Sequence, residues 1–223
     1  MGAVQPRRHP TGHPVRPWGQ LVLVRHHAVR HADRPGAGER RARAAALLTA
    51  ALPGALYVYQ GDELGLPEVE DLPLEALQDS MHFRAGRTDP GRDGCRVPLP
   101  WTRSGHSFGF SPDGSGTPAW LPQPAAGWGE RSVEVQDHDP RSMLALHRAA
   151  LASRRSEPAL RGERFSWLDS TEDVLAFTRD DVVCVVDLGT APMPLPDHHE
   201  VLLTSVDLDG DHLPADAAAW LRA

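Results

Sequence analysis

The segment from Tyr57 to Leu66, with the sequence YVYQGDELGL, most strongly constrains what this chain can fold into. It continues a short apolar run, Ala55 to Tyr59, that has the length and composition of a buried strand. A polar turn from Gln60 to Glu63 follows directly. This order predicts a strand that delivers polar side chains to one edge of a sheet.

The residues before this strand predict a parallel sheet. Leu21 to Val24 is a short apolar run typical of a strand, and Glu39 to Leu52 has the composition of a helix that Pro53 and Gly54 end. Strand, helix and strand with short connections indicate a βαβ unit. Because two parallel strands cannot close a sheet, we expect unpaired edges and exposed apolar surface here.

The middle of the chain reads as packed loops followed by one long helix. Residues from Leu66 to Gln136 are rich in Gly, Pro, Asp and Ser and carry three isolated tryptophans, a pattern that favours ordered, functional loops. Asp139 is the expected N-cap of a helix with Pro140 in its first turn, and Pro158 should end that helix. His147 lies on its predicted buried face.

The C-terminal region predicts an antiparallel β module of about 60 residues. Asp180-Asp181 is expected to form a tight hairpin turn. The third expected strand is so continuously apolar that we predict a central position for it. The four expected strands are Phe165 to Leu168, Val174 to Thr178, Val182 to Leu188 and Val201 to Ser205.

Composition narrows the classes of protein. The chain has 223 residues and a net charge of −7, so nucleic-acid binding is not expected despite a Pro-, His- and Arg-rich leader over residues 1–19. No membrane span or signal peptide is expected, which favours a cytoplasmic location. The spacing of Cys95 and Cys184 predicts free thiols. The Asp207, Asp209 and Asp211 run lacks the calcium-loop pattern, and we expect no metal and no cofactor.

Four segments in order resemble the α-glucosidases of glycoside hydrolase family 13, in the oligo-1,6-glucosidase-like branch of the α-amylase group. They are YQGDELGL, EVEDLP at Glu68 to Pro73, RDGCRVPLPW at Arg92 to Trp101 and DPRSMLALHRAAL at Asp139 to Leu151. The resemblance implies an α/β plus all-β fold: the last strands and helices of a TIM (β/α)8 barrel, then a small antiparallel β-sandwich. Composition predicts a disordered basic leader over 1–19. The resemblance implies barrel strands seven and eight with long loops over 20–158, and the β domain over 159–223.

The resemblance also implies which catalytic groups this chain lacks. Retaining glycosidases use a nucleophile and an acid/base carboxylate, and in this family both lie on earlier barrel strands. A third Asp follows the seventh strand, where LVLVRHHAVRHADR aligns with WVLSNHDVVRHATR. There His26 keeps the family's His, and His27 takes the position of that Asp. We therefore expect no catalytic residue, with His26 and Arg92 contacting substrate and Arg30 and Arg96 as further neighbours.

Three hypotheses on function follow. The first is a fragment of an α-glucosidase-like hydrolase, inactive alone, that binds α-glucoside oligosaccharides at most weakly. The second is a non-catalytic role, either as a subunit that completes a barrel whose N-terminal half is supplied in trans or as a sugar-binding module. The third is a hydrolase with an improvised site, for which Asp79, Asp89 and Asp93 are the available carboxylates.

Overall fold

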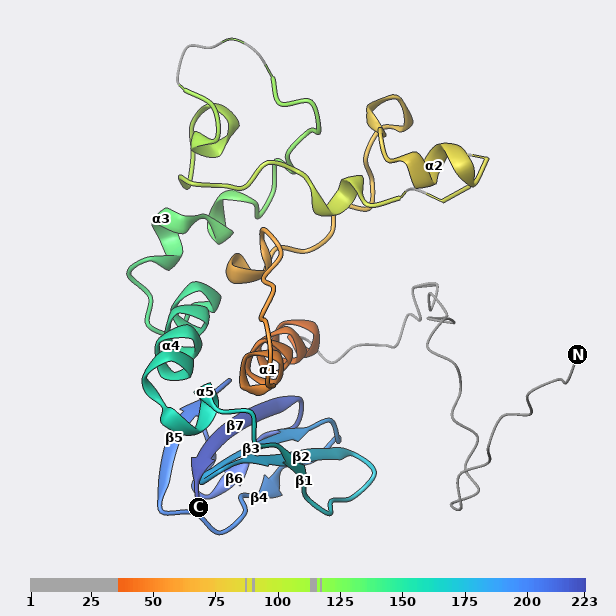
Figure 1. Ribbon diagram of the computed structural model, residues 1–223. Coiled ribbons are helices and arrows are strands. Elements are labelled where there is room, and N and C mark those ends of the chain that lie inside the picture. Colours follow the sequence, from red (N-terminus) through yellow and green to blue (C-terminus); the bar gives the residue numbers. More distant parts are fainter. Residues whose placement is uncertain (1–35, 87, 90, 113–115, 117) are drawn as a thin grey trace, which may run out of the picture. The chain divides into compact units, whose positions relative to one another are not determined.

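The computed structural model describes residues 36–86, 88–89, 91–112, 116 and 118–223 (Figure 1). The predicted leader over 1–19 and the predicted strand Leu21 to Val24 lie outside these residues. No helix within the described residues is long and apolar enough to cross a membrane.

A five-stranded antiparallel sheet forms the C-terminal region, in the order β1-β2-β3-β7-β5. The prediction that the apolar third strand is central is confirmed, since all six residues of β3 are buried. The predicted hairpin is confirmed as well: Arg179 pairs with Val182, and Asp180 takes a φ of 49° in the two-residue turn. The strands are β1 (Ser166–Trp167), β2 (Val174–Arg179), β3 (Val182–Asp187), β5 (Glu200–Thr204) and β7 (Ala217–Arg222), and β4 (Met193–Pro194) pairs with β6 (His212–Leu213) in a second sheet.

Both faces of the five-stranded sheet are buried at its central strands β3 and β7, which explains why β3 has no polar alternation. On one face, Cys184 of β3 is paired with Trp220 of β7 and packs toward the helices. On the other, Val183 and Val185 belong to a second cluster that includes Leu213 of β6. Cys95 and Cys184 are both free thiols, as predicted, and burial raises the pKa of Cys184 to about 12.

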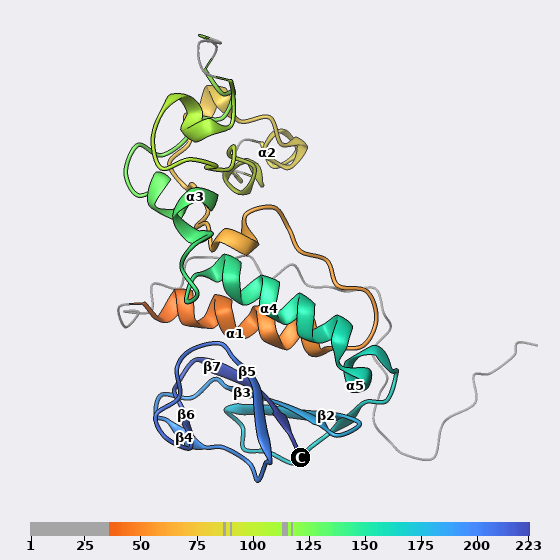
Figure 2. The same ribbon diagram turned by 90° about the vertical axis from the view of Figure 1, so that its left-hand side faces the viewer.

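Two long helices cover the first face. Figure 2 shows α1 (Ala37–Ala51) and α4 (Met143–Ser156) side by side against the sheet, and they share one apolar core with it. The short helix α5 (Pro158–Arg161) follows α4. The helices predicted in the barrel region are thus packed on the strands predicted as a separate β domain.

The N-cap of α4 differs from the prediction. Ser142, not Asp139, precedes the helix, and its Oγ accepts the Ala145 N–H at 3.1 Å. Asp139 instead accepts the Arg141 N–H at 2.9 Å within the preceding turn. Both residues have good capping side chains, and only Ser142 lies where the helical hydrogen bonds begin.

The prediction of a strand from Ala55 to Tyr59 is wrong: the described part of the chain forms no strand there. The segment is extended but pairs with no described strand, and Tyr57 is 91% exposed. A strand exists only through its ladder partners, and Leu21 to Val24, its predicted companion in the βαβ unit, lies outside the described residues. An apolar extended segment is therefore left uncovered.

The expectation of packed loops between Leu66 and Gln136 is confirmed. Val69, Val97, Leu121 and Trp128 form a small buried core, whereas Trp101 and Trp120 are exposed. Among the described residues of this region, only short helices interrupt the loops. They are η2 (Leu74–Ala76), α2 (Ser80–Arg84), η3 (Asp93–Cys95), η4 (His106–Gly109), η5 (Gly129–Arg131) and α3 (Val133–Gln136), and η1 (Asp62–Leu64) precedes them.

Two arginines donate hydrogen bonds to the free carbonyl groups at the end of α1. Arg179, 1% exposed, donates to the Ala51 oxygen at 2.6 Å, to the Leu160 oxygen at 3.0 Å and to the Gly162 oxygen. Arg154 donates to the Leu52 oxygen at 2.7 Å. Since the last carbonyls of a helix have no partner within it, these guanidinium groups join α1 to α4, α5 and β2.

We expect Arg179→Met to destabilise the fold. The substitution leaves several buried carbonyl groups without donors, so the free energy of unfolding should fall by about 3 kcal/mol. Urea unfolding followed by circular dichroism measures this change. Arg164→Met is the matched control, because that side chain is 86% exposed and its loss should change stability by less than about 0.5 kcal/mol. Equal effects of the two variants would contradict this role of Arg179.

Candidate functional site

The RDGCRVPLPW segment is held by a buried aspartate. Asp79 lies just before α2 with a fully buried side chain, and its Oδ2 accepts the Arg92 N–H at 3.0 Å and the Arg92 Nε–H at 2.7 Å. Arg96 Nη1 lies 3.3 Å from the same oxygen. Asp79 therefore fixes both the backbone and the side chain of Arg92.

A second buried aspartate closes the same loop. Asp93 Oδ2 accepts the backbone N–H groups of Gln78 at 2.6 Å and Asp79 at 2.8 Å. Its Oδ1 lies 3.4 Å from Arg96 Nη1. The two aspartates and two arginines form one network, here called the Asp79 network.

Glycines allow the chain to approach this network closely. Gly91 has a φ of +74°, and a Cβ there would lie 2.6 Å from the Asp79 Cβ. A Cβ on Gly94 would lie 2.6 Å from the Val69 oxygen. No side chain fits at either position, so the glycines of the RDGCRVPLPW region are steric requirements.

The charges of the Asp79 network stabilise one another. The hydrogen bond from Arg92 is the main cause that lowers the pKa of the Asp79 carboxyl far below its usual range. The same contact raises the pKa of the Arg92 guanidinium. Asp79 stays ionised at any physiological pH and cannot serve as a proton donor.

The polar turn after Tyr59 is organised by its own carboxylates. Asp62 Oδ2 accepts the Tyr59 N–H at 3.1 Å, and Glu63 Oε2 accepts the Gly61 N–H at 2.8 Å. Gln136 joins this turn to α4, because its Nε2 donates to the Leu64 oxygen at 2.9 Å and its Oε1 accepts the Leu144 N–H at 3.1 Å. Sequence reasoning did not identify Gln136, whose role depends on contacts across more than seventy residues.

His147 is the titratable group under this turn. It lies on α4 as predicted, and its Nε2 is buried with no hydrogen-bond partner among the described residues. Burial lowers the pKa of His147, although the nearby carboxylates of Glu63 and Asp62 act in the opposite direction. The imidazole is therefore held neutral by its surroundings.

The residues predicted to lie at the substrate site divide into two groups. Arg92 is in the Asp79 network with a side chain that is 64% exposed, and Arg96 lies beside it. His26, His27 and Arg30 lie outside the described residues. Their juxtaposition with Arg92 stays a prediction.

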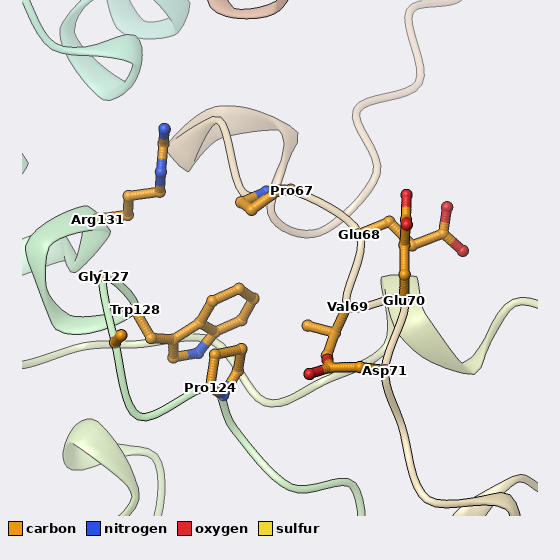
Figure 3. Close-up of a pocket in the computed structure, with 10 residues that line it drawn as sticks. Pro67, Glu68, Val69, Glu70, Asp71, Pro124, Gly127, Trp128 and Arg131 are labelled. Atoms are coloured by element: carbon orange, nitrogen blue, oxygen red, sulfur yellow. The ribbon is translucent and has the colours of Figure 1, made fainter. Parts of the chain in front are cut away.

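A cavity of about 320 Å³ lies beside the EVEDLP segment (Figure 3). One side is formed by the run from Pro67 to Asp71, and the other by Pro124, Ala126, Gly127, Trp128 and Arg131. In Figure 3 the Asp71 carboxylate points toward Trp128 and Pro124, and Arg131 extends away from Trp128. The EVEDLP segment thus forms a wall of this cavity.

The burial of His147 predicts a pH dependence of stability. Its folded-state pKa lies below the unfolded value of about 6.5, so the unfolded chain binds the additional proton and stability should fall as pH drops below about 6.5. Urea unfolding between pH 7.5 and 5.5 measures this loss. His147→Leu should flatten the dependence, and exposed His138→Gln should leave it unchanged. A His147→Leu variant as acid-sensitive as the parent chain would contradict the assignment.

Comparison with known proteins identifies the family. The sequence model of one protein family, the α-amylase catalytic domain, matches residues 7–163 of this chain. A probable α-glucosidase of Rhizobium meliloti is 35% identical over 77% of this chain and 31% of its own length. An oligo-1,6-glucosidase of Parageobacillus thermoglucosidasius is 26% identical, with 86% and 39% covered.

Solved structures agree with this result. An α-glucosyl transfer enzyme, XgtA, is 37% identical with a TM-score of 0.64, over 82% of this chain and 36% of that enzyme. A trehalulose synthase is similar in fold, with a TM-score of 0.68. The chain spans between 31% and 39% of the length of these relatives. It belongs to the α-amylase family, glycoside hydrolase family 13, and is similar to its α-glucosidases.

Proposed function

We propose that this chain supplies part of the sugar-binding wall of an α-glucosidase-type site and that by itself it does not hydrolyse α-glucosides. Within it, residues 20–158 correspond to the last part of a barrel and residues 159–223 to the β domain that follows. The α-glucosidase and glucosyl-transfer activities named for the relatives motivate this choice of substrate class.

One observation carries the proposal of inactivity: the carboxylates of the polar turn and those considered for an improvised site are already hydrogen-bonded. Asp62 and Glu63 accept backbone N–H groups of their own turn, and Asp79 and Asp93 belong to the Asp79 network. Asp89 accepts the Gly91 N–H at 2.8 Å. Retaining hydrolysis needs two carboxylates about 5 Å apart across the scissile bond, and carboxylates committed to turns do not supply them.

Arg92 is the described residue best suited to contact substrate. Its Nε and backbone N–H are committed to Asp79, which leaves Nη1 without a partner among the residues described. A guanidinium held in this way donates to a sugar hydroxyl with little loss of side-chain entropy. His26 is the second proposed contact, and His27 in the position of the family's Asp gives the site no third carboxylate.

A separate observation favours a second role, as a subunit completed by a barrel half in trans. Tyr57 is 91% exposed, and Val58 and Tyr59 are 42% and 50% exposed, in an extended segment without a described strand partner. The backbone groups of Tyr57 and Val58 have no hydrogen-bond partner among the described residues, so they are available to a neighbouring strand. The occupant proposed is a β-strand of a family 13 barrel polypeptide.

Turnover tests the first proposal. We expect the purified chain to release no 4-nitrophenol from 4-nitrophenyl α-glucoside above a protein-free blank, because Asp79, Asp89 and Asp93 are committed to hydrogen bonds within their loops. Release well above the blank, and its loss in Asp89→Asn or Asp93→Asn, would instead support the improvised site.

Binding in trans tests the second role. The probe is the part of the Rhizobium meliloti relative that this chain does not match, mixed with the full chain and followed by size-exclusion chromatography. We expect co-elution that Tyr57→Asp weakens at least about tenfold, since a buried charge has no partner in a strand interface. Leu74→Asp, at a residue 73% exposed in the loops, is the matched control. Failure to co-elute would exclude this role.

A further inference from the structure

A second cavity, of about 580 Å³, lies at the end of α4. Figure 2 shows the segment that follows α1 passing beside the ends of α4 and α5. These three elements form its walls, with Leu56 and Val58 from the segment, Leu151 and Arg155 from α4, and Arg161 from α5. A volume of this size lies within the range for small-molecule sites.

The lining of this cavity has an excess of positive charge. Arg154, Arg155 and Arg161 line it, against a single carboxylate from Glu163. The chain as a whole has a net charge of −7, so the charge of this lining is opposite in sign to that of the molecule. The excess disfavours a cationic ligand and attracts an anionic one.

Two of the arginines at this end of α4 use their donors on carbonyl groups. Arg154 donates to the Gly54 oxygen at 2.6 Å, and Arg179, behind the wall, donates to the Leu160 oxygen at 3.0 Å. Neither forms an ion pair with a carboxylate in the described part of the chain. The pKa of Arg179 is lowered first by burial and then by the charge of Arg154, with Asp180 acting in the opposite direction. Positive charge is therefore concentrated here beyond what carbonyl oxygens compensate.

The donors available to a ligand belong to Arg155 and Arg161. Both side chains are exposed, and neither has a hydrogen bond or an ion pair with any described residue. Glu163 is exposed as well and forms no ion pair with either of them. A guanidinium group binds a carboxylate through parallel N–H···O hydrogen bonds, so these two arginines fit an anionic head group.

The remaining wall is apolar and accessible. Leu56 and Leu151 are half-buried, and Val58 is 42% exposed, so each still has surface to offer a ligand. An inorganic anion would leave this surface in contact with water, whereas an attached alkyl chain would cover it. A neutral ligand would leave the two guanidinium groups without a charged acceptor. The lining thus favours a molecule that joins an anionic group to an apolar chain.

We propose that this cavity binds an organic anion with an apolar chain, of the medium-chain carboxylate type. Its carboxylate accepts hydrogen bonds from Arg155 and Arg161. Its alkyl chain packs against Leu56, Val58 and Leu151. The site binds its ligand without a bond-breaking step. The inference goes beyond the functions proposed above and does not depend on them, because neither a sugar nor a barrel half in trans takes part.

The test is an NMR titration of the full ¹⁵N-labelled chain with octanoate. We expect saturable shifts of the amides of Gly54 and Gly162, which line the cavity. Octanol has the same chain length without the charge, and acetate has the charge without the chain. Each should bind at least about tenfold more weakly than octanoate, because each lacks one of the two kinds of contact.

The double substitution Arg155→Gln and Arg161→Gln should weaken octanoate binding about tenfold or more, because the charged donors are lost. Both side chains are exposed, so the variant should keep its fold. Arg84→Gln combined with Arg141→Gln is the matched control. It changes the net charge by the same amount at exposed arginines outside the cavity and should leave the affinity unchanged.

The absence of saturable shifts at Gly54 and Gly162, or equal affinity in the double variant, would overturn the proposal. Equal affinity for octanol would overturn it by showing a purely apolar cavity, and equal affinity for acetate would do so by showing arginines that bind any anion. The titration contains neither an α-glucoside nor a partner polypeptide, so its outcome is independent of the functions proposed above.

Discussion

The fold depends on how the carbonyl groups at the end of α1 are satisfied. Helices commonly end with a left-handed residue that lets the chain bond back to the last turn, but Leu52 at this end is extended, with a φ of −65° and a ψ of 148°. Arg154 and Arg179 take over these carbonyls from two other elements. Their positive charge also lies at the negative end of the helix dipole, where it is favourable. The helix layer and the sheet are thereby joined by hydrogen bonds as well as by their shared core.

In the loops, buried carboxylates accept hydrogen bonds from free backbone N–H groups, just as arginines donate hydrogen bonds to the free carbonyl groups at the end of α1. Asp79 and Asp93 accept backbone N–H groups of a segment too irregular to satisfy them in a helix or sheet. Buried carboxylates need such donors, and Arg92 and Arg96 complete the compensation. A long loop region rich in glycine and proline can therefore be ordered with only a small apolar core around Trp128.

Sequence patterns predicted the elements whose signal is local. The apolar run of β3 and the Asp180-Asp181 turn could be predicted because burial on both faces and hairpin geometry each impose a residue pattern on a few consecutive positions. The strand β7, AAAWLR, was not identified, since alanine and leucine favour helices and only its place between β3 and β5 makes it a strand. The error at Ala55 to Tyr59 has the same origin, because pairing is not encoded in the strand itself.

The two regions of acidic residues differ in whether their charge is already compensated, and this difference decides what each can do. At the Asp79 network the aspartate charges are stabilised by arginine and backbone donors, so the carboxylates fix geometry and only the exposed part of Arg92 can reach a ligand. At the EVEDLP cavity the nearest cation is directed to Gly65 and Glu39, and Glu70 and Asp71 remain open acceptors. Sequence alone did not separate these two groups of carboxylates. The positions of the arginines distinguish a structural carboxylate from one that no cation among the described residues compensates.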